Sequence, residues 1–377
     1  MKITRVEPFI VHVPLQESIA DSTNSIDHWG FPGVVLHADN GMKGYGFTGT
    51  HAHLPGDQQI TAYIASVYGP LLQGESVESR ACIGRIWRKL HDTPPLKWIG
   101  RAGVSHLALA AVDIALWDVY AKTLDLPLWK ILHQGKGQVP SPLEAYNTDA
   151  GWLSIPKDDL VAGCLRSLER GFRGVKIKVG SANPADDLAR IEAVRKAIGP
   201  THRLMIDVNG KWSLDTAAKL APDLDAYDLF WCEEPLYFDD LVSHIELSRI
   251  MRTPMALGEQ LYSRYHFDAF LHAGAMKFVQ VDAVRVAGIT EWLTVADRAL
   301  ESGVPVVAHV GDMMQVHQHT ALAHGACTLL EFIPWAQHCF EDPATVRDGE
   351  FLPPTAPGAG TTFTSAAMTE FSKPLCR

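Results

Sequence analysis

From about residue 143 onward, short apolar runs alternate with segments that carry a helical pattern of apolar positions. The pattern predicts eight strands whose starts lie 23 to 32 residues apart. The predicted strands cover residues 143–147, 175–180, 204–209, 229–235, 254–260, 278–283, 305–310 and 328–332. Eight strand-then-helix units favour a (β/α)8 barrel. A doubly wound open sheet is the alternative, but no glycine-rich phosphate loop follows the first run.

The first 125 residues follow a different pattern. Two short apolar runs flank Asn40-Gly41, which predicts a β-hairpin over residues 33–49. Residues 105–124 carry apolar side chains at helical spacing and predict a long helix. Strands followed by helices indicate an α+β capping domain over residues 1–125.

We place the barrel domain at residues 126–340 and a C-terminal segment that returns to the capping domain at residues 341–377. Within that segment, residues 352–363 are rich in Pro and Gly and predict coil packed on the capping domain. Residues 16–30 are too polar for a core. They predict a loop, and such loops often act as lids over a site on a rigid scaffold.

Composition narrows the class of protein. The chain is 47% hydrophobic and 20% charged, as in soluble globular proteins, and we expect no membrane span. A formal net charge of −10 argues against nucleic-acid binding, although local lysines or a metal ion still allow an anionic small substrate. The six cysteines show no paired spacing, which indicates free thiols in a reducing cytoplasm.

The predicted strands carry chemically active residues near their C-terminal ends, and these ends form the active face of a barrel. In chain order these residues are Lys176, Lys178, Asp207, Glu233, Glu259, Asp282, His309 and Glu331. A single buried polar residue of this kind could be structural. So many at equivalent positions predict one catalytic site.

Asp207, Glu233 and Glu259 lie 26 residues apart each time, on three successive predicted strands. Three converging carboxylates would repel one another unless a cation lay among them. Oxygen ligands favour Mg²⁺, with Mn²⁺ also possible. We expect the neighbouring Glu234 to point to the opposite side of its strand and not to be a ligand.

Two acid/base pairs flank this predicted metal site. Lys176 and Lys178 share one strand face, and Lys176 should lower the pKa of Lys178 so that a neutral amine is available as a base. On the other side, Asp282 should orient His309 and raise its basicity. This arrangement suits abstraction of a proton α to a carboxylate, with the metal ion stabilising the enediolate.

At these residues the sequence resembles the enolase superfamily and, within it, the mandelate racemase subgroup. The resemblance covers essentially the whole chain and is carried by KIK, IDVNG, WCEEP, LGEQ, VQVDAVRVAGITEW, VVAHVG and LLEF. It implies a modified barrel with an N-terminal cap, with Lys178 and His309 as the two bases. By the same resemblance, Lys176 would touch the substrate carboxylate and Glu331 would polarise it. Asn209 either faces the site or is structural.

The motifs do not separate a dehydratase from a racemase, an epimerase or a cycloisomerase. The polar character of residues 16–30 favours a sugar acid, an aldonate or aldarate, and its dehydration to a 2-keto-3-deoxy acid. The residues expected to bind this small anionic substrate are Asn209, Asn147, His28 and Trp29, and further hydroxyl partners could be Tyr146, Lys211 and His51. We also expect a homo-oligomer.

An alternative interpretation from a different enzyme class is a zinc hydrolase of the amidohydrolase type. It rests on His317, His319 and His324 in the stretch QVHQHTALAH. That stretch has a helical pattern, in which residues i and i+2 face different directions, so rim or structural histidines are favoured. A non-catalytic binding protein on this scaffold is disfavoured because every acid/base position is filled.

Overall fold

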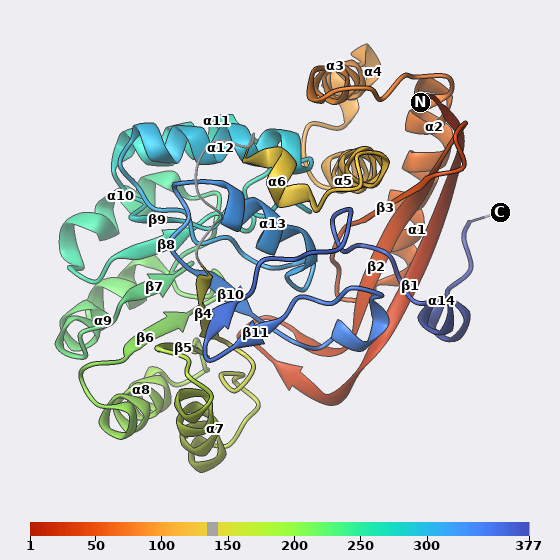
Figure 1. The fold of residues 1–377 in the computed structure, drawn as a ribbon. Helices are drawn as coiled ribbons and strands as arrows, with labels where there is room; N and C mark the ends of the chain where they lie inside the picture. Colours follow the sequence, from red (N-terminus) through yellow and green to blue (C-terminus); the bar gives the residue numbers. More distant parts are fainter. Residues whose placement is uncertain (134–141, 377) are drawn as a thin grey trace.

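The computed structural model describes residues 1–133 and 142–376. Its N-terminal part is a three-stranded antiparallel sheet covered by helices, drawn in red to yellow in Figure 1. The strands, in sheet order, are β1 (Ile3–Ala20), β2 (Ser25–Ala38) and β3 (Lys43–Phe47). The helices are α1 (Leu54–Tyr63), the π-helix η1 (Ile64–Tyr68), α2 (Gly69–Leu72), α3 (Arg80–His91), α4 (Pro94–Ile99), α5 (Val104–Thr123) and α6 (Leu128–Leu132).

The second part is the predicted barrel. Its parallel strands are β4 (Leu143–Asn147), β5 (Gly174–Lys178), β6 (Arg203–Asp207), β7 (Trp231–Glu233), β8 (Met255–Leu257), β9 (Phe278–Val279) and β10 (Leu330–Phe332). Neighbours pair in chain order from β4 to β9, and β10 pairs back onto β4. The predicted strand at 305–310 is reduced to Val306, which bridges Val279 on one side and Cys327 on the other. These bridges fill the seventh position and close the barrel.

Helices surround the barrel strands on the outside, as Figure 1 shows. They are α7 (Lys157–Glu169), α8 (Pro184–Ile198), α9 (Leu214–Ala226), α10 (Leu241–Ile250), α11 (Arg264–Ala273), α12 (Ile289–Glu301) and α13 (Gln315–Ala323). The chain ends with the 3-10 helix η2 (Gln337–Cys339), the strands β11 (Val346–Arg347) and β12 (Glu350–Phe351), and α14 (Ser365–Phe371). The fold is thus the modified barrel with an α+β cap that the sequence predicted.

The C-terminal segment packs against the N-terminal sheet. Phe363 lies within an aromatic cluster with Phe9, Phe31 and Phe47, and its ring centroid is 5.3 to 5.8 Å from theirs. The Oγ1 atom of Thr361 also donates to the carbonyl of Tyr45 at 2.6 Å. This is the packing that the Pro- and Gly-rich composition of the segment predicted, whereas the exact domain boundaries stay a prediction.

Helix α5 runs through the interior between the N-terminal sheet and the barrel. By length and composition it could cross a membrane, but 83% of its most apolar window is buried inside the protein, as in a core helix. Strand β3 approaches it closely because Gly46 has no side chain: a Cβ there would lie 2.0 Å from the carbonyl oxygen of Ala111. The Asn40-Gly41 hairpin joins β2 to β3 as predicted, with Gly41 at φ 84°.

One buried carboxylate of α5 links the cap to the barrel. Asp113 accepts hydrogen bonds from the backbone nitrogen of Thr290 at 2.8 Å and from its hydroxyl at 2.7 Å. Thr290 lies in the first turn of α12, where the preceding Gly288 has no side chain to cap the helix. A carboxylate from a cap helix thus accepts a hydrogen bond from a free backbone N–H group at the N-terminus of a barrel helix. This contact fixes the position of the cap relative to the barrel.

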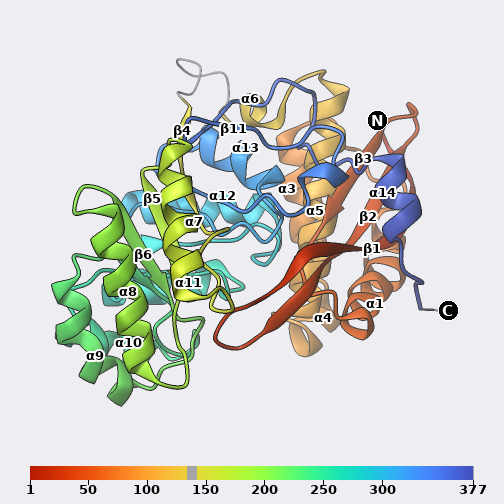
Figure 2. The same ribbon diagram turned by 90° about the horizontal axis from the view of Figure 1, so that it is seen from below.

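The prediction of a loop at residues 16–30 is wrong. These residues extend β1 and β2 into a long hairpin, with a tight turn at residues 21–24. Both ribbon views show its tip reaching to the barrel (Figures 1 and 2). The polar side chains misled the prediction because only part of this hairpin is buried, and cross-strand backbone pairing does not require apolar residues.

Candidate active site

The register of the barrel strands places three of the predicted residues side by side. Lys178 is opposite Asp207 across the β5–β6 pair, and Asp207 is opposite Glu233 across the β6–β7 pair. All three side chains are buried, with exposed fractions of 6% or less. Parallel strands in register therefore convert three positions far apart in the sequence into one row at the C-terminal face of the barrel.

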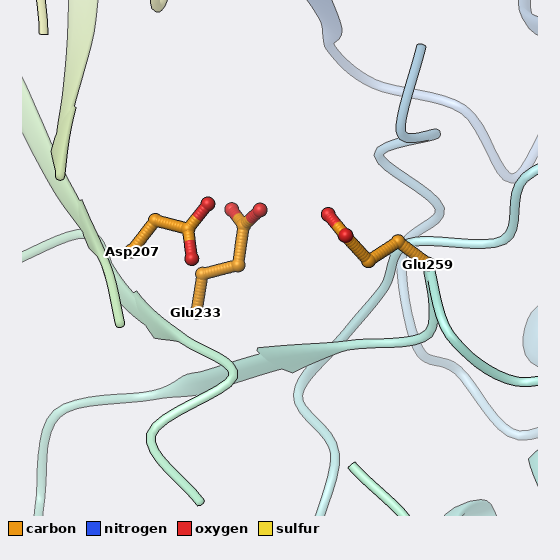
Figure 3. Close-up of side chains that lie close together, drawn as sticks. All are labelled: Asp207, Glu233 and Glu259. Carbon is orange, nitrogen blue, oxygen red and sulfur yellow. The ribbon is translucent and has the colours of Figure 1, made fainter. Parts of the chain in front are cut away.

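Glu259 completes a carboxylate cluster with this row. It lies two residues beyond the end of β8. Asp207, Glu233 and Glu259 each offer an oxygen atom within 4.8 Å of the others, and Figure 3 shows their carboxylates pointing toward a shared space. Among the described residues, this is the cluster whose spacing could hold a metal ion. Burial and the charge of Asp207 raise the pKa of Glu233 well above its usual value, a repulsion that a cation would offset.

The two lysines pair with these carboxylates. Lys178 Nζ lies 2.5 Å from Asp207 Oδ2, and Lys176 Nζ lies 2.6 Å from Glu233 Oε1 and 2.8 Å from Glu331 Oε1. Burial lowers the pKa of Lys178 and Asp207 raises it, and the net shift is upward. Lys176 lowers it, as the sequence predicted, but the facing carboxylates outweigh this effect in the protein chain alone. The net direction thus differs from the prediction.

The second predicted pair has the expected geometry. His309 Nδ1 lies 2.6 Å from Asp282 Oδ2, and the opposite ring nitrogen, Nε2, lies 3.2 Å from Glu259 Oε2. Asp282 is held in place by the backbone nitrogens of Val284 at 2.8 Å and Gly311 at 3.2 Å. The aspartate thus fixes the ring orientation and directs Nε2 toward the carboxylate cluster.

A cavity of about 490 Å³ opens above this cluster. Lys178, His309, Glu259 and Glu331 line its inner end, and the tip of the β1–β2 hairpin lines its outer end. A larger cavity of about 950 Å³ lies elsewhere, between β1 and α7, and none of the predicted acid/base residues or metal ligands line it. The size of a cavity alone therefore does not identify the active site, whereas the converging charged groups do.

Two of the predicted substrate-binding residues line the cavity. The Oδ1 atom of Asn209 is buried without a partner, and its backbone nitrogen donates to Asp207 Oδ1 at 2.9 Å. Trp29 is buried, and its indole nitrogen donates to the carbonyl of Gly311 at 3.2 Å. His51, a further candidate, also lines the cavity, and its ring centroid lies 5.3 Å from that of Trp29.

The other two predicted substrate-binding residues, Asn147 and His28, do not line this cavity. Asn147 donates to Ser167 Oγ at 3.1 Å and lines the larger cavity, because its side chain points outward from β4 toward α7. His28 pairs with Asp27 at 3.0 Å on the hairpin surface and does not line the active-site cavity. Lys211 is also exposed outside that cavity.

Tyr146 is a core residue and not a hydroxyl partner. It is fully buried inside the barrel, where its ring lies under Lys176, 5.6 Å from Nζ, and packs edge-on against Trp231. An aromatic face next to a lysine ammonium is a favourable cation–π contact. Tyr146 therefore supports Lys176 from below.

The position of Glu234 differs from the prediction. It was expected to point away from Glu233, but it is 1% exposed and lines the same cavity. Strand β7 ends at Glu233, and Glu234 adopts a left-handed backbone with φ 38°, so strand alternation no longer applies. Its Oε1 atom is buried without a partner, and burial with the charge of Glu259 raises its pKa well above the usual value.

Sequence reasoning missed two further polar residues of the site. Arg285 lines the cavity, and its guanidinium lies 3.9 Å from Glu259 Oε1 and 3.8 Å from Asp282 Oδ2. Thr148 donates to Glu331 Oε1 at 2.6 Å. A lone arginine within the apolar stretch VQVDAVRVAG was the signal for the first, whereas nothing in the sequence marked the second.

The histidines of the zinc interpretation do not converge. His317 pairs with Asp312 at 2.6 Å and accepts from the backbone of Ala283, while His319 accepts from the backbone of Trp129. His324 faces Asp297 at the protein surface. His317 and His319 lie on α13 and His324 follows its end, and the three rings meet different partners. They are therefore structural, and the zinc hydrolase interpretation is wrong.

His319 should make the stability of the protein sensitive to acid. Burial lowers its pKa from 6.5 to about 3. The unfolded chain therefore binds a proton here below about pH 6.5 while the folded protein does not, and the free energy of unfolding falls toward pH 3 by up to about 1.4 kcal/mol per pH unit. In His319→Asn, the free energy of unfolding, measured by urea titrations at pH 6, 5 and 4, should change less steeply with pH. An equal pH dependence in the variant and the parent protein would contradict the lowered pKa of His319.

Comparisons with known proteins agree with this architecture. Residues 4–133 match the model of the mandelate racemase / muconate lactonizing enzyme N-terminal domain, and residues 159–367 match the enolase C-terminal domain-like model. The chain is 34% identical over 336 residues to L-talarate/galactarate dehydratase of Salmonella typhimurium, covering 88% of this chain and 80% of that protein. It is 31% identical over 360 residues to 3,6-anhydro-alpha-L-galactonate cycloisomerase of Streptomyces coelicolor. That match covers 95% of this chain and 96% of the relative.

A solved structure extends the likeness to three dimensions. L-talarate dehydratase from Polaromonas, in complex with Mg and L-glucarate, superposes with a TM-score of 0.88 at 31% identity, over 99% of this chain and 98% of that one. The two matched domain models together cover most of the chain, residues 4–133 and 159–367. The chain therefore belongs to the mandelate racemase / muconate lactonizing enzyme family of the enolase superfamily.

Proposed function

We propose that the protein is a Mg²⁺-dependent hydro-lyase that dehydrates a sugar acid to a 2-keto-3-deoxy acid. The observation that carries the proposal is the placement of two different acid/base groups, Lys178 and the His309–Asp282 pair, around one carboxylate cluster in one cavity. The names of the Salmonella and Polaromonas relatives support the same reaction class.

Asp207, Glu233 and Glu259 would hold the metal ion. Their oxygen ligands, their burial and their mutual repulsion suit a hard divalent cation such as Mg²⁺, with Mn²⁺ possible. When bound, the ion supplies positive charge that stabilises the negative charge developing on the substrate carboxylate. The Polaromonas relative contains Mg in its solved structure, which supports the choice of metal.

The chain's own residues then divide the reaction. One of Lys178 and His309 removes the α proton, and the electrons of that C–H bond move toward the substrate carboxylate to form an enediolate. These electrons then form the double bond between the α and β carbons as the β-hydroxyl leaves. The other group, in its protonated form, donates a proton to the departing hydroxyl, which becomes water. The enol that remains takes up a proton at the β carbon and loses the proton of its hydroxyl group on the α carbon, which gives the 2-keto acid. Lys176 and Glu331 lie 2.8 Å apart beside the cluster, where they would bind and polarise the substrate carboxylate.

A racemase, epimerase or cycloisomerase is the second candidate function. It would use the same two bases, and the Streptomyces relative carries the name of a cycloisomerase. The polar residues Asp21, Thr23 and Asn24 at the outer end of the cavity favour a hydroxylated substrate in either case. We further propose that the enzyme is cytoplasmic, in keeping with its six free cysteines, and that it is a homo-oligomer.

The proposed reaction predicts a carbonyl product. Purified protein with Mg²⁺ and a library of aldonates and aldarates should give a 2-keto acid from one or a few members, detected with semicarbazide. Loss of the signal with EDTA and its return with Mg²⁺ would exclude a metal-independent side reaction. Formation of a stereoisomer without a keto acid would instead favour the racemase or epimerase.

The metal assignment predicts a difference between two neighbouring carboxylates. Glu259→Gln should weaken Mg²⁺ binding by more than about 100-fold, since loss of a ligand exceeds the 10- to 100-fold effect of outer residues, and should abolish turnover. Glu234→Gln is the matched control and should weaken binding by less than about 100-fold, because Glu234 is not a ligand. Calorimetry with Mg²⁺ and electron paramagnetic resonance with Mn²⁺ measure both. Equal affinity of Glu259→Gln and the parent protein would refute the assignment.

Separate roles for the two bases predict different behaviour in D₂O. Lys178→Ala and His309→Asn should both lose dehydration by at least about 100-fold, the lower range of general acid–base catalysis. The variant that retains the proton-abstracting base should still exchange the α hydrogen of the substrate for deuterium, as followed by NMR. Equal loss of exchange in both variants would argue against the division of roles.

A further inference from the structure

The outer wall of the active-site cavity is a fixed part of the protein. At the hairpin tip, the hydroxyl of Ser22 donates to the carbonyl of Val208 at 2.6 Å, just beyond the end of β6. The backbone of Ala20 accepts from Leu153 at 2.8 Å and donates to Ser154 Oγ at 3.0 Å. Three hydrogen bonds thus join the hairpin tip to the barrel, so the groups it presents to the cavity have defined positions.

The hairpin tip presents one charged group to the cavity, and it is negative. Asp21 lines the outer end together with Thr23 and Asn24. Its Oδ1 atom accepts from the backbone nitrogens of Thr23 and Asn24, each at 2.7 Å, which holds the carboxylate at the turn. A ligand group that reaches this end therefore meets a carboxylate, a hydroxyl and an amide.

The cationic groups that line the cavity are already opposed by carboxylates at its inner end. Among the described lining residues, the lysine and arginine side chains are Lys178 and Arg285. Lys178 faces Asp207 at 2.5 Å, and Arg285 lies within 4.0 Å of both Glu259 and Asp282. Both cations therefore lie beside the carboxylates of the inner end, whereas the charged group at the hairpin tip is Asp21.

The histidine near the outer end does not supply a cation either. Burial and the neighbouring Arg285 lower the pKa of His51 below its ordinary value of 6.5, so the ring is neutral at pH 7. The remaining wall is aromatic: the Trp335 ring centroid lies 5.8 Å from that of Trp29 and 4.9 Å from that of Trp152. Aromatic faces and neutral donors suit the C–H and hydroxyl groups of an uncharged sugar chain.

We infer that the enzyme acts on sugar acids with a single carboxylate, aldonates whose far end is an uncharged hydroxyl, and that Asp21 discriminates against the corresponding diacids. This inference rests on the proposed function and narrows its substrate class. The substrates in the name of the Salmonella relative, talarate and galactarate, are both diacids, so the inference separates this chain from that relative.

The test compares aldonates and aldarates of the same configuration, in the galacto, gluco, manno and talo series, with the Mg²⁺-loaded enzyme. For the best pair, kcat/KM should be at least about tenfold higher for the aldonate, because the second carboxylate of an aldarate faces Asp21 across the cavity. A smaller or reversed ratio overturns the inference while the proposed function stands. No keto acid from either class overturns the proposed function and this inference with it.

Two variants in the β1–β2 hairpin test whether Asp21 causes the preference for aldonates over aldarates. Asp21→Asn removes the charge and keeps an acceptor for the backbone of Thr23 and Asn24, and should raise the aldarate-to-aldonate ratio of kcat/KM by about threefold or more. Asp27→Asn removes an exposed charge from the same hairpin outside the cavity and should leave this ratio unchanged. Equal ratios in Asp21→Asn and the parent enzyme would overturn the role of Asp21. If Asp21→Asn does not fold, the comparison of substrates on the parent enzyme still tests the inference.

Discussion

Compensation of charge among buried groups is the constraint on which this structure depends. Asp207, Glu233, Glu259, Asp282 and Glu331 are all 5% exposed or less, and isolated carboxylates at such depth would be too costly to keep ionised. Lys176, Lys178 and Arg285 oppose them within 4.0 Å. The same pairing that makes burial tolerable places acids, bases and candidate metal ligands within reach of one substrate.

The barrel and the cap contribute different parts of the site. The barrel supplies the charged inner end, because its parallel strands present polar residues in register at one face. The cap supplies the outer end through the β1–β2 hairpin, whose tip is hydrogen-bonded to the barrel. Reaction type is thus encoded mainly in the barrel, and we propose that substrate choice is encoded mainly in the hairpin.

Several residues that follow the barrel strands have a strained backbone. Asn209, Glu234, Met313 and Met314 all have positive φ, from 38° to 82°, and the first three line the cavity. Such conformations are costly for residues other than glycine and persist where the surrounding structure enforces them. In Glu234 the consequence is visible: the strained backbone turns into the cavity a carboxylate that a regular strand would direct away from Glu233.

The sequence by itself determined the fold class and the inner site, because both follow from local patterns. Alternating strand and helix patterns implied a barrel, and barrel strands carry their active residues at one end. The two lysines, the three equally spaced carboxylates and the Asp282–His309 pair could therefore be placed together from their spacing alone.

Tertiary structure decided the features that depend on contacts between distant segments. Residues 16–30 form a hairpin because β1 and β2 pair with each other and their tip meets the barrel, which their polar composition does not indicate. The inward turn of Glu234, the outward direction of Asn147 and the entry of Arg285 depend on where each strand ends and which neighbour it meets. The periodicity of a sequence specifies which face of an element is buried, but only packing specifies what that face meets.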